Sequence, residues 1–429
     1  MIKDVETENI LNLIKREVVP AIGCTEPVAV AFAVAKAKEA LGCIPEKIEV
    51  KLSANVLKNA MGVGIPGTDM IGLPIAVALG AIVGKSEYGL EVLKDLTTNA
   101  LEQGKKMIKD KKITISLYEN APDKLYIESV CTSGKDVVKA VVSGEHTNVV
   151  MIEKNNNIIF DNRQTHSVEN EYNIPELTLQ KIYDFATQTP VEKLQFILES
   201  AKLNKIAAEK SLTENYGHTL GKIINGVDEK AVMGDSMFSK ILSYTSSACD
   251  ARMAGAMIPI MTNSGSGNQG ITATMPIVVY SEETMQSEES LIRALTLSHL
   301  CVIYIKQKMG RLSALCGCVV ASTGSACGIT YLMGGTFEQI TFAVKNMIAG
   351  LTGVICDGAK PSCSLKIAGS VSSAVFSAMM ALENKFVKSV EGIIDDDVDK
   401  SIRNLTQIAS TGMLETDKMI LDIMVNKSV

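Results

Sequence analysis

The spacing of hydrophobic and polar positions changes near the middle of the chain. In the first part, apolar residues recur at helical spacing over residues 28–40 and alternate with polar residues over 47–53. Apolar runs over residues 74–84 and 87–109 predict two more helices. Segments of strand character, separated by short polar turns, follow at residues 113–118, 125–131, 137–143 and 149–154. Four consecutive strands joined by turns predict an antiparallel meander.

From residue 177 onward, nearly every segment has the apolar spacing of a helix. A chain of 429 residues is longer than one compact core usually holds, so we expect two domains. We therefore predict an α+β protein. Its N-terminal α/β domain, with a mostly antiparallel sheet, would cover residues 1–170, and an all-α domain would cover residues 171–429.

Composition narrows the functional classes. A net charge of −6 gives no basic footprint for nucleic acid. The first residues do not have the basic start and apolar centre of a signal peptide, and no apolar run reaches the roughly 18 residues that span a bilayer. Ten cysteines without an export signal indicate a reducing cytoplasm, where thiols are packed or bind metals. We expect no membrane or nucleic-acid partner, and the oligomeric state stays open, a homo-oligomer included.

Two pairs of cysteines carry the strongest chemical signal. Cys356 and Cys363 flank a short loop between helical segments, and Cys316 and Cys318 lie upstream in another apolar helix. Three converging thiolates can hold a 4Fe-4S cluster and leave one iron open as a Lewis acid. The alternative is that these thiols are small core residues, because free cysteine is among the most buried residue types.

Another cysteine, Cys24, is followed by Thr25, Glu26, Pro27 and an apolar helical segment. Thr25 suits the N-cap position of that helix, which puts Cys24 at the helix N-terminus. The helix dipole favours a thiolate there, so we expect a lowered pKa for Cys24. An inert thiol in a helix-entry turn is the alternative.

Polar groups that could hold a carboxylate lie in two places. The loop Ser-Gly-Ser-Gly-Asn-Gln-Gly at residues 264–270 leaves backbone N–H groups open, and such a nest binds carboxylate or phosphate. Asn55, Lys58 and Asn59 follow the end of a predicted strand, where ligand groups commonly lie. Arg252 offers a guanidinium for a carboxylate, with a structural ion pair as the alternative.

Four motifs occur together and in this order: GCTEP at residues 23–27, SANVLKN at 53–59, SGSGNQG at 264–270 and CDGAK at 356–360. In combination they resemble the L-cysteine desulfidase family, relatives of the iron–sulfur serine dehydratase α domain. The similarity runs over nearly the whole chain. Each motif is modest alone, but four in order are hard to obtain by chance.

The resemblance implies an oxygen-sensitive 4Fe-4S cluster on three cysteines, no pyridoxal phosphate, and conversion of L-cysteine to pyruvate, ammonia and hydrogen sulfide. The family's ligand positions match Cys316, Cys356 and Cys363, and its proton acceptor matches Cys24. Cys318 is the second candidate for the first ligand, and we expect it to face another side of the helix from Cys316. The serine dehydratases space their last two ligand cysteines differently, and the chain has no counterpart to their regulatory segment. Both points favour the desulfidase branch without excluding serine.

The implied reaction also needs donors for the carboxylate of its substrate, L-cysteine. We predict that the substrate-binding residues are Asn55, Lys58, Asn59, Ser264, Ser266, Asn268, Gln269 and Lys360. The site would then lie between the two domains, where ligand clefts are common. A thiolate leaving group suits an iron because both are soft, whereas the same iron would polarise a serine hydroxyl less selectively.

Other functions could use the same residues. One is an L-serine dehydratase of the same cluster type. Another is a non-enzymatic metal-binding or sensor protein whose thiolates hold, for instance, zinc. A third is a helical enzyme with packed cysteines and no metal. No sequence feature marks the Schiff-base lysine of a pyridoxal enzyme.

Overall fold

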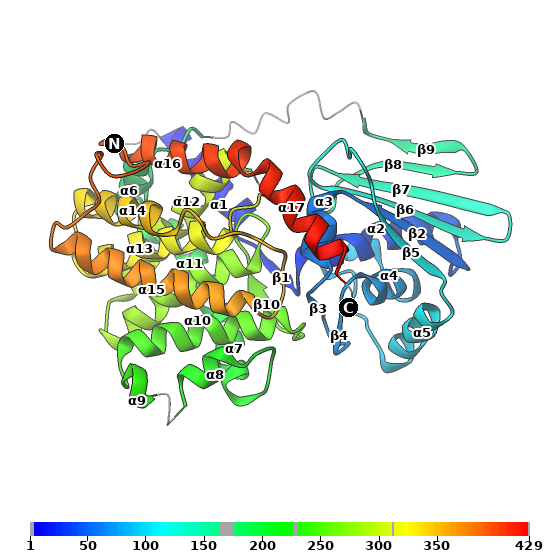
Figure 1. The fold of residues 1–429 in the computed structure, drawn as a ribbon, viewed down its shortest axis with the longest axis horizontal. Coiled ribbons are helices and arrows are strands. Elements are labelled where there is room, and N and C mark those ends of the chain that lie inside the picture. Colours follow the sequence, from blue (N-terminus) through cyan, green and yellow to red (C-terminus); the bar gives the residue numbers. More distant parts are fainter. Residues whose placement is uncertain (1–3, 164–174, 227–229, 311–312, 428–429) are drawn as a thin grey trace.

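The structure is a computed structural model that describes residues 4–163, 175–226, 230–310 and 313–427. Figure 1 shows two parts, one built around a sheet and one built of helices. The predicted fold class is confirmed: the N-terminal region has a mixed, mostly antiparallel sheet with helices, and the C-terminal region is helical. The predicted boundary between residues 170 and 171 lies outside the described residues.

The main sheet has the strand order β5-β2-β6-β7-β8-β9. Its strands are β2 (Lys47–Leu52), β5 (Ile113–Leu117), β6 (Tyr126–Ser133), β7 (Asp136–Ser143), β8 (Val149–Lys154) and β9 (Asn157–Asp161). β5 pairs in parallel with β2, and the other pairs are antiparallel. The predicted meander is therefore wrong at its start, because β2 lies between β5 and β6. The sequence pattern also missed β9, whose residues are all exposed and whose ends are polar.

A helical crossover allows β2 and β5 to be parallel. The crossover contains α3 (Ala54–Ala60), β3 (Gly64–Ile65), β4 (Met70–Ile71), α4 (Leu73–Ile82), the 3₁₀ turn η1 (Ser86–Glu91) and α5 (Thr98–Lys109). α2 (Thr25–Leu41) packs on β6 and β7, and α4 packs against α2. The helix predicted over residues 87–109 begins only at Thr98. Gly89 leaves the helical conformation, and Thr97 caps α5 by accepting a hydrogen bond from the Ala100 N–H.

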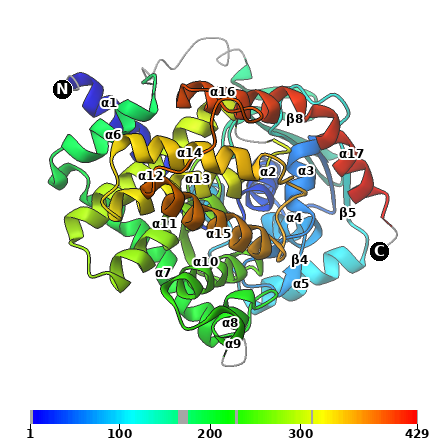
Figure 2. The ribbon, with the colours of Figure 1, turned by 60° about the vertical axis from the view of Figure 1, so that its left-hand side comes forward.

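The helical part is arranged around α13, which contacts α11, α12, α14 and α15 (Figure 2). Its helices are α6 (Leu179–Gln188), α7 (Leu198–Thr213), α8 (Leu220–Ile224), α9 (Lys230–Met233), α10 (Met237–Met253), α11 (Gly267–Glu283), α12 (Glu288–Met309), α13 (Gly317–Leu332), α14 (Phe337–Leu351), α15 (Cys363–Leu382) and α16 (Val398–Gln407). Small residues permit the close packing: a Cβ on Gly324 of α13 would lie 2.5 Å from the Ser298 carbonyl oxygen of α12.

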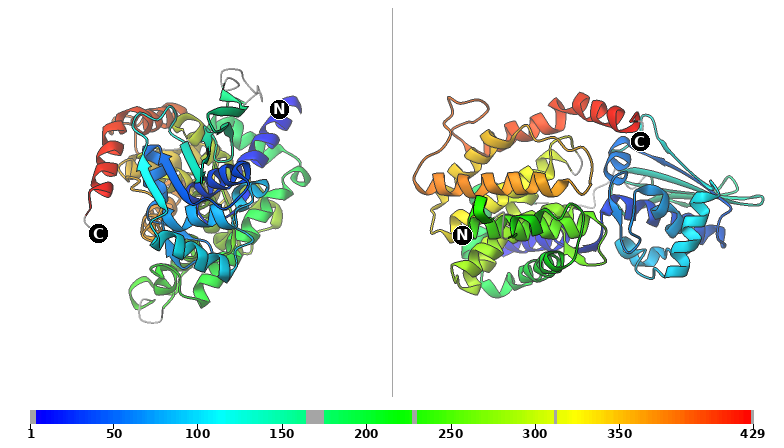
Figure 3. Two further views of the ribbon diagram at one scale, coloured as in Figure 1. Left: turned by 90° about the vertical axis from the view of Figure 1, so that its right-hand side faces the viewer. Right: turned by 60° about the horizontal axis from the view of Figure 1, so that its bottom comes forward.

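The two parts are joined by elements from both ends of the chain. α1 (Asp4–Glu17) packs in the core of the helical part, and β1 (Pro20–Ile22) pairs with β10 (Pro259–Met261). At the other end, α17 (Leu414–Val425) runs from the helical part to lie beside α3 (Figures 1 and 3). Residues distant in sequence therefore meet at the junction of the two parts.

α15 is, among the described helices, the one whose length and apolar composition would allow it to cross a membrane. It packs against α10, α13 and α14, and 44% of its most apolar window is buried. Buried core helices pass the same test, so this property alone carries little weight.

Candidate functional site

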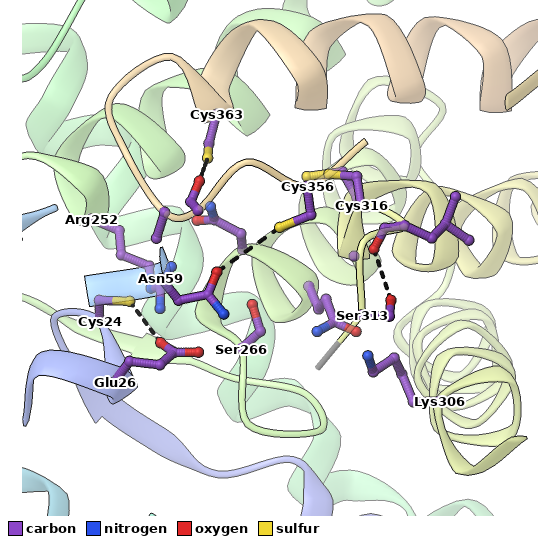
Figure 4. Close-up of a pocket in the computed structure, with 17 residues that line it drawn as sticks. Cys24, Glu26, Asn59, Arg252, Ser266, Lys306, Ser313, Cys316, Cys356 and Cys363 are labelled. Atoms are coloured by element: carbon purple, nitrogen blue, oxygen red, sulfur yellow. Dashed lines mark hydrogen bonds between the residues drawn. The ribbon is translucent and has the colours of Figure 1, made fainter. Parts of the chain in front are cut away.

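A cavity at the junction of the two parts collects most of the chemically active side chains (Figure 4). It is a small cavity, with about 90 Å³ of free space enclosed by its lining. Its sulfur-bearing and polar lining comprises Cys24, Glu26, Asn59, Arg252, Ser266, Asn268, Gln269, Lys306, Ser313, Cys316, Cys318, Cys356 and Cys363. Both parts of the chain contribute to this lining.

Four helices begin at the cavity. α2, α11 and α13 have Cys24, Ser266 and Cys316 as their N-cap residues, and Cys363 is the first residue of α15. None of these four helix starts, all within the described residues, has a side-chain cap. Backbone N–H groups at helix N-termini carry partial positive charge and bind anions. The cavity is therefore suited to negatively charged groups.

Short strand pairing places the Cys24 turn beside the loop before α11. β1 pairs with β10, and Thr25 Oγ1 donates a hydrogen bond to the Gly265 carbonyl oxygen at 2.9 Å. Buried His299 of α12 holds the loop in place. Its Nδ1 lies 3.0 Å from Asn263 Nδ2, and its Nε2 lies 3.0 Å from Thr274 Oγ1. Burial lowers the pKa of His299 to about 3, so this ring is neutral and serves as a structural anchor.

The three predicted metal ligands all line this cavity, and Cys318 does so as well. Our expectation that Cys316 and Cys318 face different sides is wrong. Cys316 is an extended N-cap residue with φ −67° and ψ 129°, so helical spacing does not apply between the two. Cys363 Sγ lies 3.7 Å from the Gly358 carbonyl oxygen, and Cys356 Sγ lies 4.0 Å from Asn59 Oδ1 (Figure 4).

The thiols differ in how readily they ionise. The Cys318 side chain donates a hydrogen bond that lowers the pKa of Cys316 to about 6, against the opposing effect of burial, and Lys366 and Lys360 add to the lowering. Burial raises the pKa of Cys363 to about 11 and also raises that of Cys356. Of the three predicted metal ligands, Cys316 is therefore the thiol that most readily becomes a thiolate.

Cys24 lies at the N-terminus of α2 as predicted, but the N-cap residue is Cys24 itself and not Thr25, and the predicted lowered pKa is wrong. Burial raises the pKa of this thiol well above its usual value, and the negative charge of Glu26 adds to the rise. Cys24 is 1% exposed, and its Sγ donates a hydrogen bond to Glu26 Oε2 at 3.0 Å. Desolvation and a nearby carboxylate thus outweigh the helix dipole.

Arg252, at the end of α10, is the cavity's most unusual cation. The side chain is 3% exposed, and among the described residues none accepts a hydrogen bond from it or forms an ion pair with it. Gly267 makes room for it, since a Cβ there would lie 2.2 Å from Arg252 Nε. Gln269 Oε1, also buried, has no partner in the described chain either. A buried guanidinium without a protein counter-ion indicates a site for an anionic ligand.

Four predicted substrate-binding residues lie outside this cavity lining. Asn55 and Lys58 instead engage Asp417 of α17, with Asn55 Nδ2 donating to Asp417 Oδ2 at 2.7 Å. Ser264 Oγ donates to Asn263 Oδ1 at 2.9 Å. The Lys360 ammonium lies 2.5 Å from the Asp357 carboxylate.

Of the other predicted substrate-binding residues, Asn59, Ser266, Asn268 and Gln269 line the cavity. The sequence reasoning missed Glu26 and Lys306 as cavity residues. Glu26 could have been found from its spacing, because N-cap and N2 side chains are neighbours at a helix start. Lys306 gave no local signal, since its place depends on how α12 packs.

The donor set fits an iron–sulfur cluster in its chemistry. Cys316, Cys356 and Cys363 come from three separate segments and share one wall, next to unfilled helix N-termini that favour negative charge. Within the described ranges, no three His, Cys, Asp or Glu side chains are grouped closely enough to hold a single metal ion. A cluster differs in this respect, because its thiolates bind separate irons.

A chain of this fold, with cysteines gathered at a cavity between a sheet part and a helical part, matches the serine dehydratase alpha chain over residues 87–422. It is also 65% identical to a UPF0597 protein of Bacteroides thetaiotaomicron over 98% of both chains. A UPF0597 protein of Porphyromonas gingivalis is 52% identical over 98% of both chains. The chain therefore belongs to the serine dehydratase alpha chain family and, within it, to the UPF0597 proteins. Members of that family use iron–sulfur clusters, and the match indicates a lyase of the dehydratase type.

Proposed function

We propose that this protein is an L-cysteine desulfidase, a carbon–sulfur lyase that converts L-cysteine to hydrogen sulfide, pyruvate and ammonia with a 4Fe-4S cluster. The observation that carries the proposal is the meeting of three kinds of group in one cavity. They are the thiols of the helical wall, the unpartnered Arg252 guanidinium and the Cys24 thiol. An α,β-elimination on an amino acid needs a metal centre, a carboxylate anchor and a base, and these three groups supply them.

Arg252 and the start of α11 would anchor the substrate carboxylate. The guanidinium offers paired N–H donors, and the N–H groups of the first turn of α11 have no side-chain cap. Ser266, Asn268 and Gln269 border the same place and add donors. Fixing the carboxylate here orients the rest of a small amino acid toward the thiol wall.

Cys316, Cys356 and Cys363 would hold the cluster, with Cys318 as the second candidate for the first ligand. When bound, the cluster supplies a Lewis-acidic iron for the heteroatom on the substrate Cβ. The uncapped N-termini of α13 and α15 stabilise the negative charge of these thiolates. Asp357 does not face the thiols alone: its charge is paired with Lys360 and Lys366.

Cys24 would take the Cα proton. It lies on the wall formed by α2, on the side of the cavity away from Cys363 and Cys356 (Figure 4). A substrate whose carboxylate is held at Arg252 would then lie in the cavity that Cys24 and the proposed metal ligands both line. Because the pKa of this thiol is raised, its thiolate is a stronger base than an ordinary one, provided that its own proton is first removed.

An L-serine dehydratase is the second candidate, and the family match favours it. The two substrates differ only in the atom on Cβ, sulfur or oxygen. We prefer L-cysteine because a soft thiolate binds iron more readily than a hydroxyl does. A thiolate is also the better leaving group of the two.

The deciding experiment is an anaerobic assay of the iron-loaded protein with each substrate. Sulfide and pyruvate are measured from L-cysteine, and pyruvate from L-serine, with D-cysteine as the stereochemical control. We expect kcat/KM to be at least about tenfold higher for L-cysteine than for L-serine, equivalent to roughly 1.4 kcal/mol. The reverse order would identify a serine dehydratase. A loaded cluster with no turnover of either substrate would favour a metal-binding or sensor protein.

A further inference from the structure

Cys24 and Glu26 form a hydrogen-bonded pair at the start of α2. The distance from Cys24 Sγ to Glu26 Oε2 is 3.0 Å, and both side chains line the cavity while being 1% and 9% exposed (Figure 4). Thr25 Oγ1 lies 3.1 Å from the same carboxylate oxygen. The thiol is the donor and the carboxylate the acceptor, so in this arrangement the proton resides on sulfur.

A thiol in this state cannot serve as a base. It must first lose its proton, and buried surroundings with a neighbouring carboxylate oppose that loss. The other charged side chains that line the cavity are Arg252 from α10 and Lys306 from α12, which are cations and cannot accept a proton. Across the cavity lie the thiols of the helical wall. Among the described residues, the side chain that accepts a hydrogen bond from Cys24 Sγ is that of Glu26.

We propose that Glu26 takes the Cys24 proton and so generates the thiolate that removes the substrate Cα proton. The S–H bond of Cys24 breaks and an O–H bond forms on Glu26 Oε2, and the pair keeps one negative charge. The Cys24 thiolate then takes the substrate Cα proton, which restores its S–H bond. The electron pair of the Cα–H bond forms the Cα–Cβ double bond, and the heteroatom on Cβ leaves with the electron pair of its bond. The proton on Glu26 returns to solvent.

The geometry also explains why the carboxylate stands two residues from the thiol. Cys24 is the N-cap residue of α2 and Glu26 lies in its first turn, so both side chains lie at the same helix end, where the structure brings them together. Glu26 acts through Cys24 and does not itself need to touch the substrate. It is in this sense a positioning residue with a proton-accepting role. The inference rests on the proposed function, in which Cys24 is the base.

The test compares Glu26→Gln and Glu26→Asp with wild type in the anaerobic, iron-loaded protein. The glutamine keeps the size of the side chain but cannot hold the proton. We expect unchanged iron and acid-labile sulfide, a KM within about threefold, and a kcat lower by roughly 10²-fold or more, the range for one acid–base group. The shorter Asp should restore part of kcat and shift the acid limb of the pH profile. Glu49→Gln is the matched control, because the Glu49 side chain on β2 is 45% exposed and lies outside the cavity lining.

A second measurement does not depend on turnover. Alkylation of Cys24 by iodoacetamide is followed by peptide mass spectrometry between pH 6 and pH 10. Removing the Glu26 charge lowers the pKa of Cys24, so Cys24 in Glu26→Gln should be alkylated faster than in wild type at a given pH.

Unchanged kcat in Glu26→Gln alongside an inactive Cys24→Ala would overturn the inference and leave the proposed function standing. Equal alkylation rates would overturn the pairing. A wild type inactive on both substrates would overturn the proposed function, while the alkylation result would still decide the pairing.

Discussion

Cys24 and Cys316 occupy the same local position in two regions of the molecule. Both are extended N-cap residues of apolar helices, both are buried, and both line the one cavity. Yet the pKa of Cys24 is raised and that of Cys316 is lowered. The helix dipole is common to both and cannot account for the difference.

Their immediate neighbours account for it. Cys24 faces the carboxylate of Glu26, which penalises a thiolate, whereas Cys316 accepts a hydrogen bond from Cys318 and has Lys366 and Lys360 nearby. The Cys24 side of the cavity therefore holds a proton on sulfur, whereas on the other side Cys316, unlike Cys356 and Cys363, favours the thiolate. The first state suits a group that exchanges protons, and the second suits a metal ligand.

The largest effect should come from the thiol wall. Cys356→Ala removes one proposed ligand, so we expect the brown absorbance of the cluster and the lyase activity to disappear together. Iron and acid-labile sulfide per chain provide the measurement. Cys43→Ala is the control, because Cys43 is an exposed thiol away from the cavity. A Cys356 variant with full cluster content would remove this residue from the ligand set.

The proton-holding side should respond differently. Cys24→Ala should retain the cluster absorbance and lose kcat by roughly 10²- to 10⁴-fold, the contribution of one general base. Ultraviolet–visible spectra and sulfide release, measured on the same samples, separate the two effects. If this variant still releases sulfide at the wild-type rate, Cys24 is not the essential base and the division between the two sides fails.

Arg252 lines the same cavity, and its loss should affect substrate binding more than chemistry. Arg252→Gln removes a charge-assisted contact of about 1.5–3 kcal/mol, which predicts a KM higher by roughly 10- to 100-fold with the cluster retained. Steady-state kinetics on L-cysteine provide the measurement. Arg163→Gln is a matched control, since Arg163 is exposed and pairs with Asp161 outside the cavity. A KM that stays at the wild-type value would mean that the carboxylate binds elsewhere.

The features that the sequence could predict were set by local pattern. Helical and strand periodicity indicated the fold class. The placement of Cys24 at a helix start followed from the polar residues and proline after it. The cysteines of the helical half were candidates for a shared site because few other residues there carry such chemistry.

The features that it could not predict depend on contacts between distant segments. Lys58 looks like a ligand group from its loop-like sequence, but its ammonium is taken by Asp417, 359 residues further along the chain. For Arg252 the sequence left a carboxylate site and a structural ion pair open, and only the fold reveals that its Nε is buried without a partner among the described residues. The pKa of Cys24 likewise depended on burial, which a helix-dipole argument does not contain.

The smallest expected effect is a difference in thiol reactivity in the cluster-free protein. Cys316, with a pKa of about 6, is mostly thiolate at pH 7, whereas Cys363, with a pKa of about 11, and Cys24 remain thiols. Iodoacetamide at pH 7 should therefore label Cys316 at least about tenfold faster than Cys24. The ratio of labelling rates is smaller than the ratio of thiolate fractions because a thiolate of lower pKa is a weaker nucleophile. Lowering the pH through 6 should slow the labelling of Cys316 and leave the already slow Cys24 little changed. Peptide mass spectrometry, normalised to exposed Cys43, gives both rates. Equal rates would show that the shared helix-start position, rather than the neighbouring charges, sets the ionisation of both thiols.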